Sequence, residues 1–208
     1  MSSVLLIDGH PNPESLCSAL AARYAQGARS AGASVEVLAL RELRFDPVLH
    51  LGYRGEQPLE PDLQQAQQRI RAASHVCLVT PLWWGSVPAL LKGFFDRTLQ
   101  RGWAYRYKPN GMPEGLLAGR SARVLLTTDS PGWYLRLVQG SPTERQLVRS
   151  TLRFCGLKPV RVTRFGPVHN SQPADRARWL EQAAALGGTD AARCLAAGVR
   201  PGAVVQAR

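Results

Sequence analysis

Short apolar runs alternate with segments of helical periodicity along most of this chain, and that alternation restricts the possible folds. Val4–Ile7 and Val76–Thr80 are typical of strands that are buried on both faces of a sheet. Between them, Leu16, Leu20 and Tyr24 recur at the spacing of one face of a helix. This order predicts strand–helix–strand units, and therefore an α/β fold with a parallel sheet covered by helices on both faces.

The remaining elements are expected in the same alternating order. Strands are expected at 4–7, 34–40, 76–80, 122–127 and 159–165, and helices at 16–28, 62–73, 90–99, 143–154 and 172–186. A connection rich in Pro and Gly at 44–60 is long enough to be a functional loop. With 208 residues the chain can bury one sizeable core, so one domain is expected over 1–188. After Gly187-Gly188, the tail 189–208 is expected to be loosely ordered or used at a contact.

The stretch from Pro81 to Tyr107, PLWWGSVPALLKGFFDRTLQRGWAYRY, carries the most functional information. It begins directly after an expected buried strand, so its first residues form a loop at the carboxyl end of that strand. Ligands bind at this end in open α/β sheets. Trp83 and Trp84 lie on the loop, and flat aromatics beside free backbone N–H groups suit a flat ring with polar edges, such as a flavin. The alternative is that both tryptophans are core residues, and Trp84 could also be a half-buried pocket wall.

PLWWGSVPALLKGFFDR followed by GWAYRY resembles the signature of the flavodoxin-like NAD(P)H:quinone oxidoreductases, the DT-diaphorase family and its bacterial FMN-dependent relatives. The similarity runs from Val4 to about Phe165. It implies a flavodoxin-like, doubly wound, five-stranded parallel sheet with helices on both faces. It also implies bound FMN and NAD(P)H as the electron donor. FAD is less favoured, because the C-terminal extension of the mammalian enzymes is not expected here.

The turn after the first expected strand is a candidate phosphate site. It precedes a helix N-terminus, where free N–H groups and the helix dipole favour an anion. His10 and Ser15 could each donate a hydrogen bond to a phosphate. From the residues alone, an ordinary Pro-rich turn capped by Ser is equally consistent. The resemblance assigns His10, Ser15, Leu16 and Cys17 to the phosphate-binding stretch, although relatives usually carry a polar residue where Cys17 stands.

Two further turns hold the flavin ring according to the same resemblance. One lies on the loop after the central strand and offers backbone amides; the other ends the fourth strand and holds the pyrimidine side. The assigned residues are Pro81, Leu82, Trp83, Trp84, Gly85, Thr127, Thr128, Asp129 and Ser130. Asp129 and Ser130 stand where the family has glycines. An ordinary Asx turn at Asp129 is as consistent with the sequence as a direct role.

Three tyrosines match positions near the family's active site. Tyr134 matches the active-site tyrosine to within one position and is the candidate catalytic residue. The family's partner histidine is missing a few residues later, so a Tyr/His proton relay does not carry over; Arg136 could balance negative charge on a reduced flavin instead. Tyr105 and Tyr107 match an aromatic pair that reaches the neighbouring subunit's site, which implies a homodimer with shared sites. Their alternation is also typical of a strand with one apolar face.

The formal net charge of +11 comes almost entirely from arginine, since lysine occurs only at Lys92, Lys108 and Lys158. One interpretation is a nucleic-acid or anionic membrane partner. The other is that arginines are scattered over solvated faces. We favour the second and expect no nucleic-acid partner, because the chain shows no long basic run and no nucleic-acid motif.

The cysteines and histidines favour a reduced, metal-free protein. Cys17, Cys77, Cys155 and Cys194 are far apart and form no C-x-x-C pair, and two of them lie in apolar runs. His50, His75 and His169 have no spacing suggestive of a metal site and are expected to be surface or capping residues. No signal peptide and no integral membrane segment are expected, which predicts a cytoplasmic protein.

Together these features give one main hypothesis and two alternatives. The main hypothesis is an FMN-dependent NAD(P)H oxidoreductase that transfers two electrons to a quinone or similar aromatic acceptor by a ping-pong hydride mechanism. One alternative, also based on the resemblance, is an ancillary regulatory flavoprotein of a membrane potassium-efflux system. The other is a nucleic-acid binder, which charge alone motivates.

Overall fold

The computed structural model describes residues 3–52 and 54–197, and a parallel sheet of five strands lies at its centre. The strands are β1 (Ser3–Asp8), β2 (Ser34–Ala39), β3 (His75–Pro81), β6 (Ser121–Thr127) and β7 (Val160–Phe165). Their order across the sheet is β2-β1-β3-β6-β7, and each neighbouring pair is parallel. This topology confirms the predicted flavodoxin-like α/β fold. The strand order reverses between β1 and β3, and their carboxyl ends therefore border the crevice in which such sheets bind ligands.

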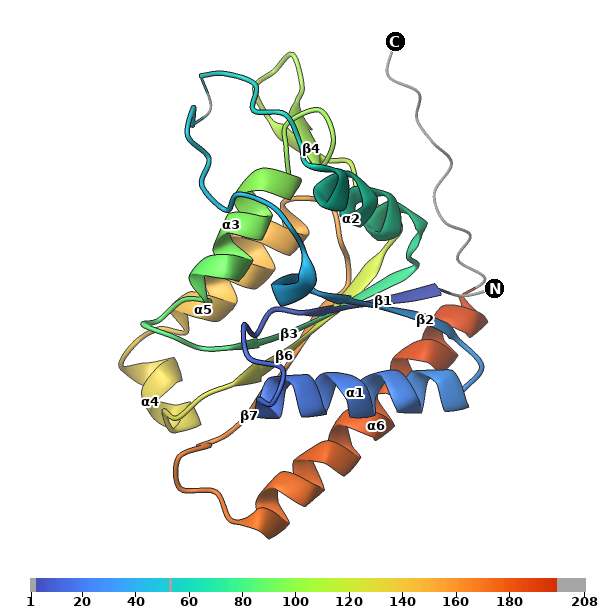
Figure 1. Ribbon diagram of the computed structural model, residues 1–208, viewed down its shortest axis with the longest axis vertical. Coiled ribbons are helices and arrows are strands. Elements are labelled where there is room, and N and C mark those ends of the chain that lie inside the picture. Colours follow the sequence, from blue (N-terminus) through green and yellow to red (C-terminus); the bar gives the residue numbers. More distant parts are fainter. Residues whose placement is uncertain (1–2, 53, 198–208) are drawn as a thin grey trace.

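Helices cover both faces of the sheet (Figure 1). One face carries α1 (Leu16–Ser30) and α6 (Pro173–Ala196), and the other carries α2 (Pro61–Ala72), α3 (Ala89–Thr98) and α5 (Pro142–Glu144). η2 (Arg145–Arg153) continues α5 directly, in agreement with the helix predicted at 143–154. The smaller elements are η1 (Leu40–Glu42), α4 (Gly132–Leu137) and the antiparallel pair β4 (Tyr105–Tyr107) and β5 (Pro113–Gly115).

The central strand β3 separates two apolar cores. All seven of its residues are buried, because helices pack on both faces of the sheet. Val76 and Leu78 belong to the core beneath α2 and α3, whereas Cys77 and Val79 belong to the core beneath α1 and α6. This alternation follows from the two-residue period of a strand. It explains why a doubly covered strand reads as a continuous apolar run in the sequence.

The helix α6 is longer than the sequence predicted. It was expected to end at Leu186, but it continues through Gly187-Gly188 to Ala196, and Asp190, Ala191 and Cys194 are buried. The predicted helix end at Leu186 is therefore wrong, and residues 189–196 belong to α6; residues 198–208 lie outside the described part of the chain. The two glycines are not a stop signal. A Cβ on Gly187 would lie 2.1 Å from the Tyr24 carbonyl oxygen, so this residue allows α6 to cross α1 closely.

A buried polar cluster lies near the amino ends of β3 and β6. This amino-edge cluster consists of Tyr24, His75, Arg123 and Asp190, each at most 5% exposed. The Asp190 carboxylate accepts hydrogen bonds from the Arg123 guanidinium and from the Tyr24 hydroxyl at 3.0 Å. His75 lies 3.1 Å from the Tyr24 hydroxyl through Nε2 and 2.7 Å from the Ser121 hydroxyl through Nδ1. The expectation of a surface or capping role is therefore wrong for His75, whereas His50 and His169 are exposed.

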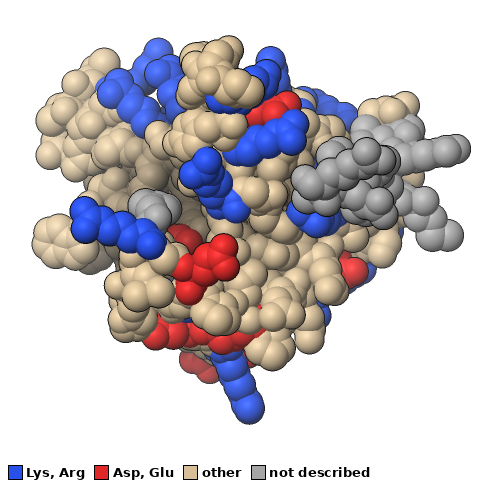
Figure 2. All heavy atoms as spheres, turned by 90° about the horizontal axis from the view of Figure 1, so that it is seen from above, with Lys and Arg blue, Asp and Glu red and all other residues tan. Residues whose placement is uncertain are grey.

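The surface agrees with scattered basic charge. In Figure 2, Lys and Arg side chains occupy several separate places on the face seen from above, with Asp and Glu between some of them. Part of the arginine charge is internal, since Arg97, Arg120 and Arg123 are buried. Among the described residues, no helix combines the length and apolar character needed to cross a bilayer, and no group of acidic, His and Cys side chains is arranged to hold a metal ion.

Candidate functional site

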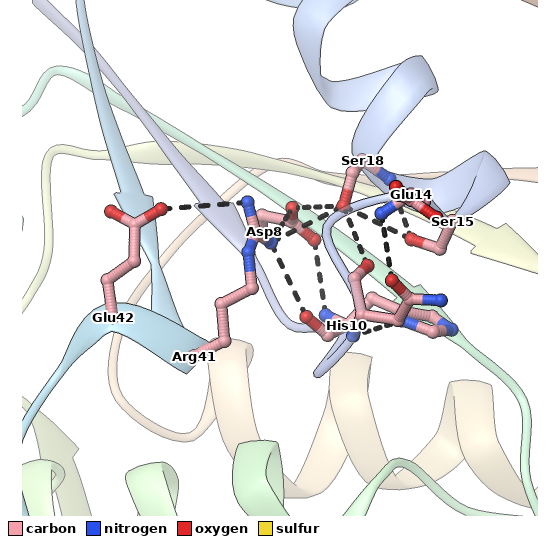
Figure 3. A network of polar contacts seen from close by, with 8 residues as sticks. Asp8, His10, Glu14, Ser15, Ser18, Arg41 and Glu42 are labelled. Atoms are coloured by element: carbon pink, nitrogen blue, oxygen red, sulfur yellow. Dashed lines mark hydrogen bonds and ion pairs between the residues drawn. The ribbon is translucent and has the colours of Figure 1, made fainter.

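The loop between β1 and α1 is shaped by hydrogen bonds between its own residues (Figure 3). Ser15 caps α1 in an extended conformation, and its hydroxyl accepts a hydrogen bond from the Ser18 amide at 3.1 Å. The amides of Leu16 and Cys17 are the first two of the helix, and helix geometry leaves such amides without intrahelical acceptors. This end of α1 therefore presents free donors and the positive end of a helix dipole to the space above it.

His10 is held in a defined tautomer in the same loop. Its Nδ1 accepts a hydrogen bond from the Asn12 amide at 3.0 Å, so in the neutral ring the proton is on Nε2. The ring packs edge-on against Trp83, with 5.5 Å between centroids. Burial lowers the pKa of His10 below its ordinary value, against the charge of Asp8, which raises it. Near neutral pH, His10 is thus a neutral N–H donor beside the cavity.

A carboxylate and a guanidinium lie directly behind this loop. The Asp8 carboxylate, at the end of β1, accepts hydrogen bonds from the His10 amide at 3.1 Å and from the Ser18 hydroxyl at 2.7 Å. It also pairs with Arg41 from η1 at 2.6 Å. Asp8, His10, Ser18 and Arg41 form what we call the phosphate-loop cluster (Figure 3). Asp8, Ser18 and Arg41 were not predicted from the sequence; an acidic residue at a strand end beside a candidate anion site was the available signal.

The loop after β3 forms a tight turn. The amide of Leu82 donates to the Thr127 carbonyl, and Trp83 and Ser86 exchange two backbone hydrogen bonds of 2.9 and 3.0 Å. Trp84 and Gly85 at the tip both have positive φ, of 51° and 71°. The indole of Trp84 is fully exposed in the single chain. In one chain, therefore, Trp84 is not the half-buried pocket wall that was expected. The amides of Leu82 and Trp83 already have partners within the chain, which leaves the turn tip as the source of free donors.

The turn at the end of β6 is fixed by the segment after β7. Asp129 accepts a hydrogen bond from the His169 amide at 2.7 Å, and the Thr128 carbonyl accepts one from the Val168 amide at 3.0 Å. The Ser130 amide donates to the Thr128 hydroxyl, as in a local side-chain turn. The structure thus favours the structural interpretation of Asp129, as an anchor for the crossing segment.

These three turns converge on one cavity of about 200 Å³. Its lining residues are His10, Ser15, Leu16, Cys17, Pro81, Leu82, Trp83, Thr127, Thr128, Asp129 and Val168. All but Val168 belong to the cofactor site expected from the sequence. Of the other expected residues, Trp84, Gly85 and Ser130 are adjacent in the chain but do not line the cavity. Val168 was missed because it follows a strand that carried no motif.

The donors of this cavity fit the phosphate end of FMN. An anion would meet the first amides of α1, the Ser15 hydroxyl and the Nε2–H of His10, all of which are neutral donors. The cavity is smaller than the roughly 300–1,000 Å³ of pockets that enclose a whole ligand. It would therefore hold only part of such a molecule, and the rest would lie at its open side.

The three tyrosines lie outside this cavity. Tyr134 is half-buried on α4, with its ring edge-on to Trp133. Tyr105 and Tyr107, on β4, line a separate, broad hollow of about 1,420 Å³ between the 44–60 connection, the first turn of α2, α3 and η2. Tyr105 packs on Phe154 with 4.9 Å between ring centroids, and Tyr107 is half exposed. Within one chain, therefore, the structure does not bring Tyr105 or Tyr107 to the three turns.

Lys92, Gly93 and Arg97, which match the family pattern in the central motif, each have a structural role. Lys92 and Asp96 form an ion pair on the surface of α3. A Cβ on Gly93 would lie 2.4 Å from Pro47, so glycine is needed where the long connection crosses the helix. Arg97 is fully buried and binds the Pro58 carbonyl and the Glu60 carboxylate, both at 2.8 Å. Gly93 and Arg97 therefore fasten the 44–60 connection to α3, whereas the Lys92–Asp96 pair lies within the helix; none of these residues lines the cavity between the three turns.

Comparison with known proteins places the chain among redox enzymes. The model of a family described as having a flavodoxin-like fold matches residues 2–186. An uncharacterized NAD(P)H oxidoreductase of Haemophilus influenzae is 32% identical over 185 residues, covering 86% of this chain and 91% of that protein. An FMN-dependent NADH:quinone oxidoreductase of Gluconobacter oxydans is 31% identical, covering 72% of this chain and 80% of that protein. The structure of an NAD(P)H:quinone oxidoreductase from Methanothermobacter marburgensis superposes with a TM-score of 0.75 at 25% identity, covering 90% and 98% of the two chains.

Proposed function

We propose a function on the premise that this chain belongs to the flavodoxin-like family matched over residues 2–186: it is an FMN-dependent NAD(P)H oxidoreductase that reduces quinones or similar aromatic acceptors. The observation that carries the proposal is the convergence of three sheet-end turns on one cavity whose donors fit a flavin phosphate. The relatives reported above are oxidoreductases, so the regulatory alternative has no specific support.

In this proposal each turn holds a different part of FMN. The β1–α1 loop binds the phosphate through the amides of Leu16 and Cys17, the Ser15 hydroxyl and His10. The turn from Pro81 to Gly85 lies along the ring edge, and Thr127 to Ser130 hold the pyrimidine side. Exposed donors in these turns are fixed before binding, which lowers the entropic cost of ordering them.

The bound flavin would supply a two-electron carrier that takes hydride from NAD(P)H and returns it to the acceptor, so donor and acceptor would use one site in turn. The chain contributes binding, orientation and exclusion of water. Tyr134 is the proposed catalytic residue, as a proton donor or hydrogen-bond partner for the acceptor. Arg136, exposed on the same short helix, is the proposed source of positive charge near the ring.

A homodimer is the proposed assembly, because the site of one chain is open. Large apolar side chains are exposed on the loop after β3, on α4 and directly after it: Trp84, Trp133, Leu137 and Val138. A second copy would cover them and contribute Tyr105 and Tyr107 to its partner's site. We further propose a cytoplasmic location, which the buried Cys17, Cys77 and Cys155, none of them in a disulfide, support.

The test combines spectra and turnover. Purified protein, stripped of any ligand and titrated with FMN under anaerobic conditions, is expected to show a flavin absorption band with altered shape and quenched fluorescence. NADH or NADPH should bleach this band, and a quinone should restore it. A protein that gains no flavin band with FMN or FAD contradicts the proposal. Sedimentation at several concentrations tests the dimer, and Tyr107→Ala should then impair acceptor reduction while FMN stays bound.

A further inference from the structure

The phosphate-loop cluster contains a buried negative charge at the place where we propose that another negative charge binds. The Asp8 side chain is 3% exposed and accepts hydrogen bonds from the His10 amide and the Ser18 hydroxyl. The Ser18 hydroxyl lies 3.1 Å from that of Ser15, the N-cap that faces the cavity. Asp8 is therefore one hydrogen-bonded hydroxyl away from the proposed phosphate site. An uncompensated carboxylate here would repel a phosphate dianion.

Arg41 is placed to remove this conflict. Its Nη1 lies 2.6 Å from the Asp8 carboxylate, 3.3 Å from the Ser18 hydroxyl and 3.5 Å from the His10 carbonyl. One guanidinium nitrogen thus contacts the Asp8 carboxylate, the Ser18 hydroxyl and the backbone carbonyl of His10 at the same time. The side chain is 20% exposed, and its other contact is a long one of 3.8 Å to the exposed Glu42. Figure 3 shows Arg41 reaching Asp8 from η1, with dashed lines from its guanidinium to Asp8, Ser18 and His10.

We propose that Arg41 is a positioning residue for the flavin phosphate, which acts by neutralising Asp8 and fixing the loop from His10 to Ser15 rather than by contacting the phosphate. The inference rests on the proposed function and deepens it. Asp8 gives the loop its shape, because it orients the His10 amide and the Ser18 hydroxyl. Arg41 makes that shape compatible with an anion. The pair therefore contributes to recognition of the phosphate and not of the flavin ring.

The comparison of FMN with riboflavin isolates this contribution, since riboflavin lacks only the phosphate. Dissociation constants of both are measured by fluorescence quenching for the wild type and for Arg41→Gln. The variant is expected to lose FMN affinity by about tenfold to a hundredfold, the scale of a charged hydrogen bond, while riboflavin affinity changes by less than about threefold. Arg44→Gln, an exposed arginine of the same segment, is the matched control for the change in net charge and should leave both constants unaltered.

A second substitution distinguishes charge balance from direct contact. If Arg41 acts through Asp8, Asp8→Asn in the Arg41→Gln background removes the unpaired carboxylate and restores much of the FMN affinity. Arg41→Lys keeps the positive charge and should retain most of the FMN affinity. It also provides a folded variant should Arg41→Gln unfold. Circular dichroism verifies the fold of each variant.

Three results overturn the inference. The first is an unchanged ratio of FMN to riboflavin affinity in Arg41→Gln. The second is a double variant that binds FMN no better than Arg41→Gln, because Arg41 would then act on the phosphate directly. The third is a wild-type protein that binds neither ligand, which removes the proposed function and this inference with it. Binding of both ligands by the wild type, with either of the first two results, leaves the proposed function intact.

Discussion

The two ends of the sheet carry polar clusters that are similar in composition but differ in burial. The phosphate-loop cluster at the carboxyl end joins Asp8 and Arg41 to a serine and a histidine, and the amino-edge cluster joins Asp190 and Arg123 to a tyrosine and a histidine. In the first, the arginine is partly exposed and the loop opens onto a cavity. In the second, every member is buried.

This difference shows that the residue types in a polar cluster do not by themselves determine whether the cluster binds a ligand or stabilises the fold. At the amino end, helices α1 and α6 close over the cluster, and its groups satisfy one another, so nothing remains for a ligand. At the carboxyl end, the helix N-terminus leaves donors without partners. The Asp190–Arg123 pair thus stabilises the packing of the fold, whereas the Asp8–Arg41 pair supports the loop that borders the cavity.

The largest expected effect is on stability at the amino end. Asp190→Ala leaves the Arg123 guanidinium and the Tyr24 hydroxyl without their buried acceptor, and removal of one partner of a buried pair costs about 3–5 kcal/mol. Arg41→Ala at the carboxyl end should cost less, about 1–3 kcal/mol, because Arg41 is itself 20% exposed and the Asp8 carboxylate keeps its hydrogen bonds from the His10 amide and the Ser18 hydroxyl. Urea unfolding of both variants without flavin measures the contrast. Equal losses would show that the two clusters do not differ as described.

The next effect is the pH dependence that His75 introduces. Burial lowers the pKa of His75 to about 4, against the attraction of Asp190, which raises it. The unfolded chain then binds a proton that the folded chain does not, between the ordinary histidine value and about 4. Stability is therefore full above about pH 6.5 and falls by about 3 kcal/mol as the pH approaches 4.

The matched variant for this prediction is His75→Gln, which cannot titrate. Unfolding free energies of both proteins are compared at about pH 7 and pH 4. Between about pH 7 and pH 4, the unfolding free energy of the wild type should fall by about 3 kcal/mol more than that of the variant. Parallel curves would mean that His75 is protonated in the folded protein, and that the amino-edge cluster is not a neutral-histidine network.

A smaller effect tests why the amino end is closed. Gly187→Ala places a Cβ against the Tyr24 carbonyl of α1 and should destabilise the fold by about 1–3 kcal/mol. Gly188→Ala, one residue later in the same helix, meets only an ordinary contact with Gly27 and should stabilise α6 by up to about 1 kcal/mol. Thermal unfolding of the two variants gives opposite signs if α6 crosses α1 as observed.

The smallest effect concerns proton uptake at the carboxyl end. Burial lowers the pKa of His10 in the free protein, and a bound phosphate would raise it again, so FMN binding takes up a proton. Between about pH 7.5 and 6, FMN affinity of the wild type should rise by up to about tenfold relative to His10→Gln. Titrations at both pH values measure it, and the variant corrects for the titration of the phosphate itself. Identical pH profiles would exclude His10 from the phosphate site.

Much of the site could be predicted because it depends on local order. The turns that carry His10, Thr127 and Pro81 each follow an apolar run, and the carboxyl ends of parallel strands meet at one edge. The strands of the main sheet and the longer helices, apart from the end of α6, were predicted within a few residues for the same reason, since the periodicity of apolar positions is a local property.

The departures all come from contacts between distant segments. Glycines 187 and 188 read as a helix end, but α1 packs against them and uses the missing Cβ atom. His75 begins a strand and was expected at the surface or as a cap, yet Tyr24 and Ser121, each more than forty positions away, give its buried ring hydrogen-bond partners. Val168 lines the cavity because backbone hydrogen bonds hold its segment across the β6 turn.

The sequence by itself determined the order of strands and helices, the edge of the sheet that carries the site and the three turns that form it. Hydrophobic periodicity and turn chemistry act over a few residues, so they can be read directly along the chain. The tertiary structure alone decided which polar groups are closed off and which stay open. That outcome depends on burial, and burial is set by helices that meet only after the whole chain has folded.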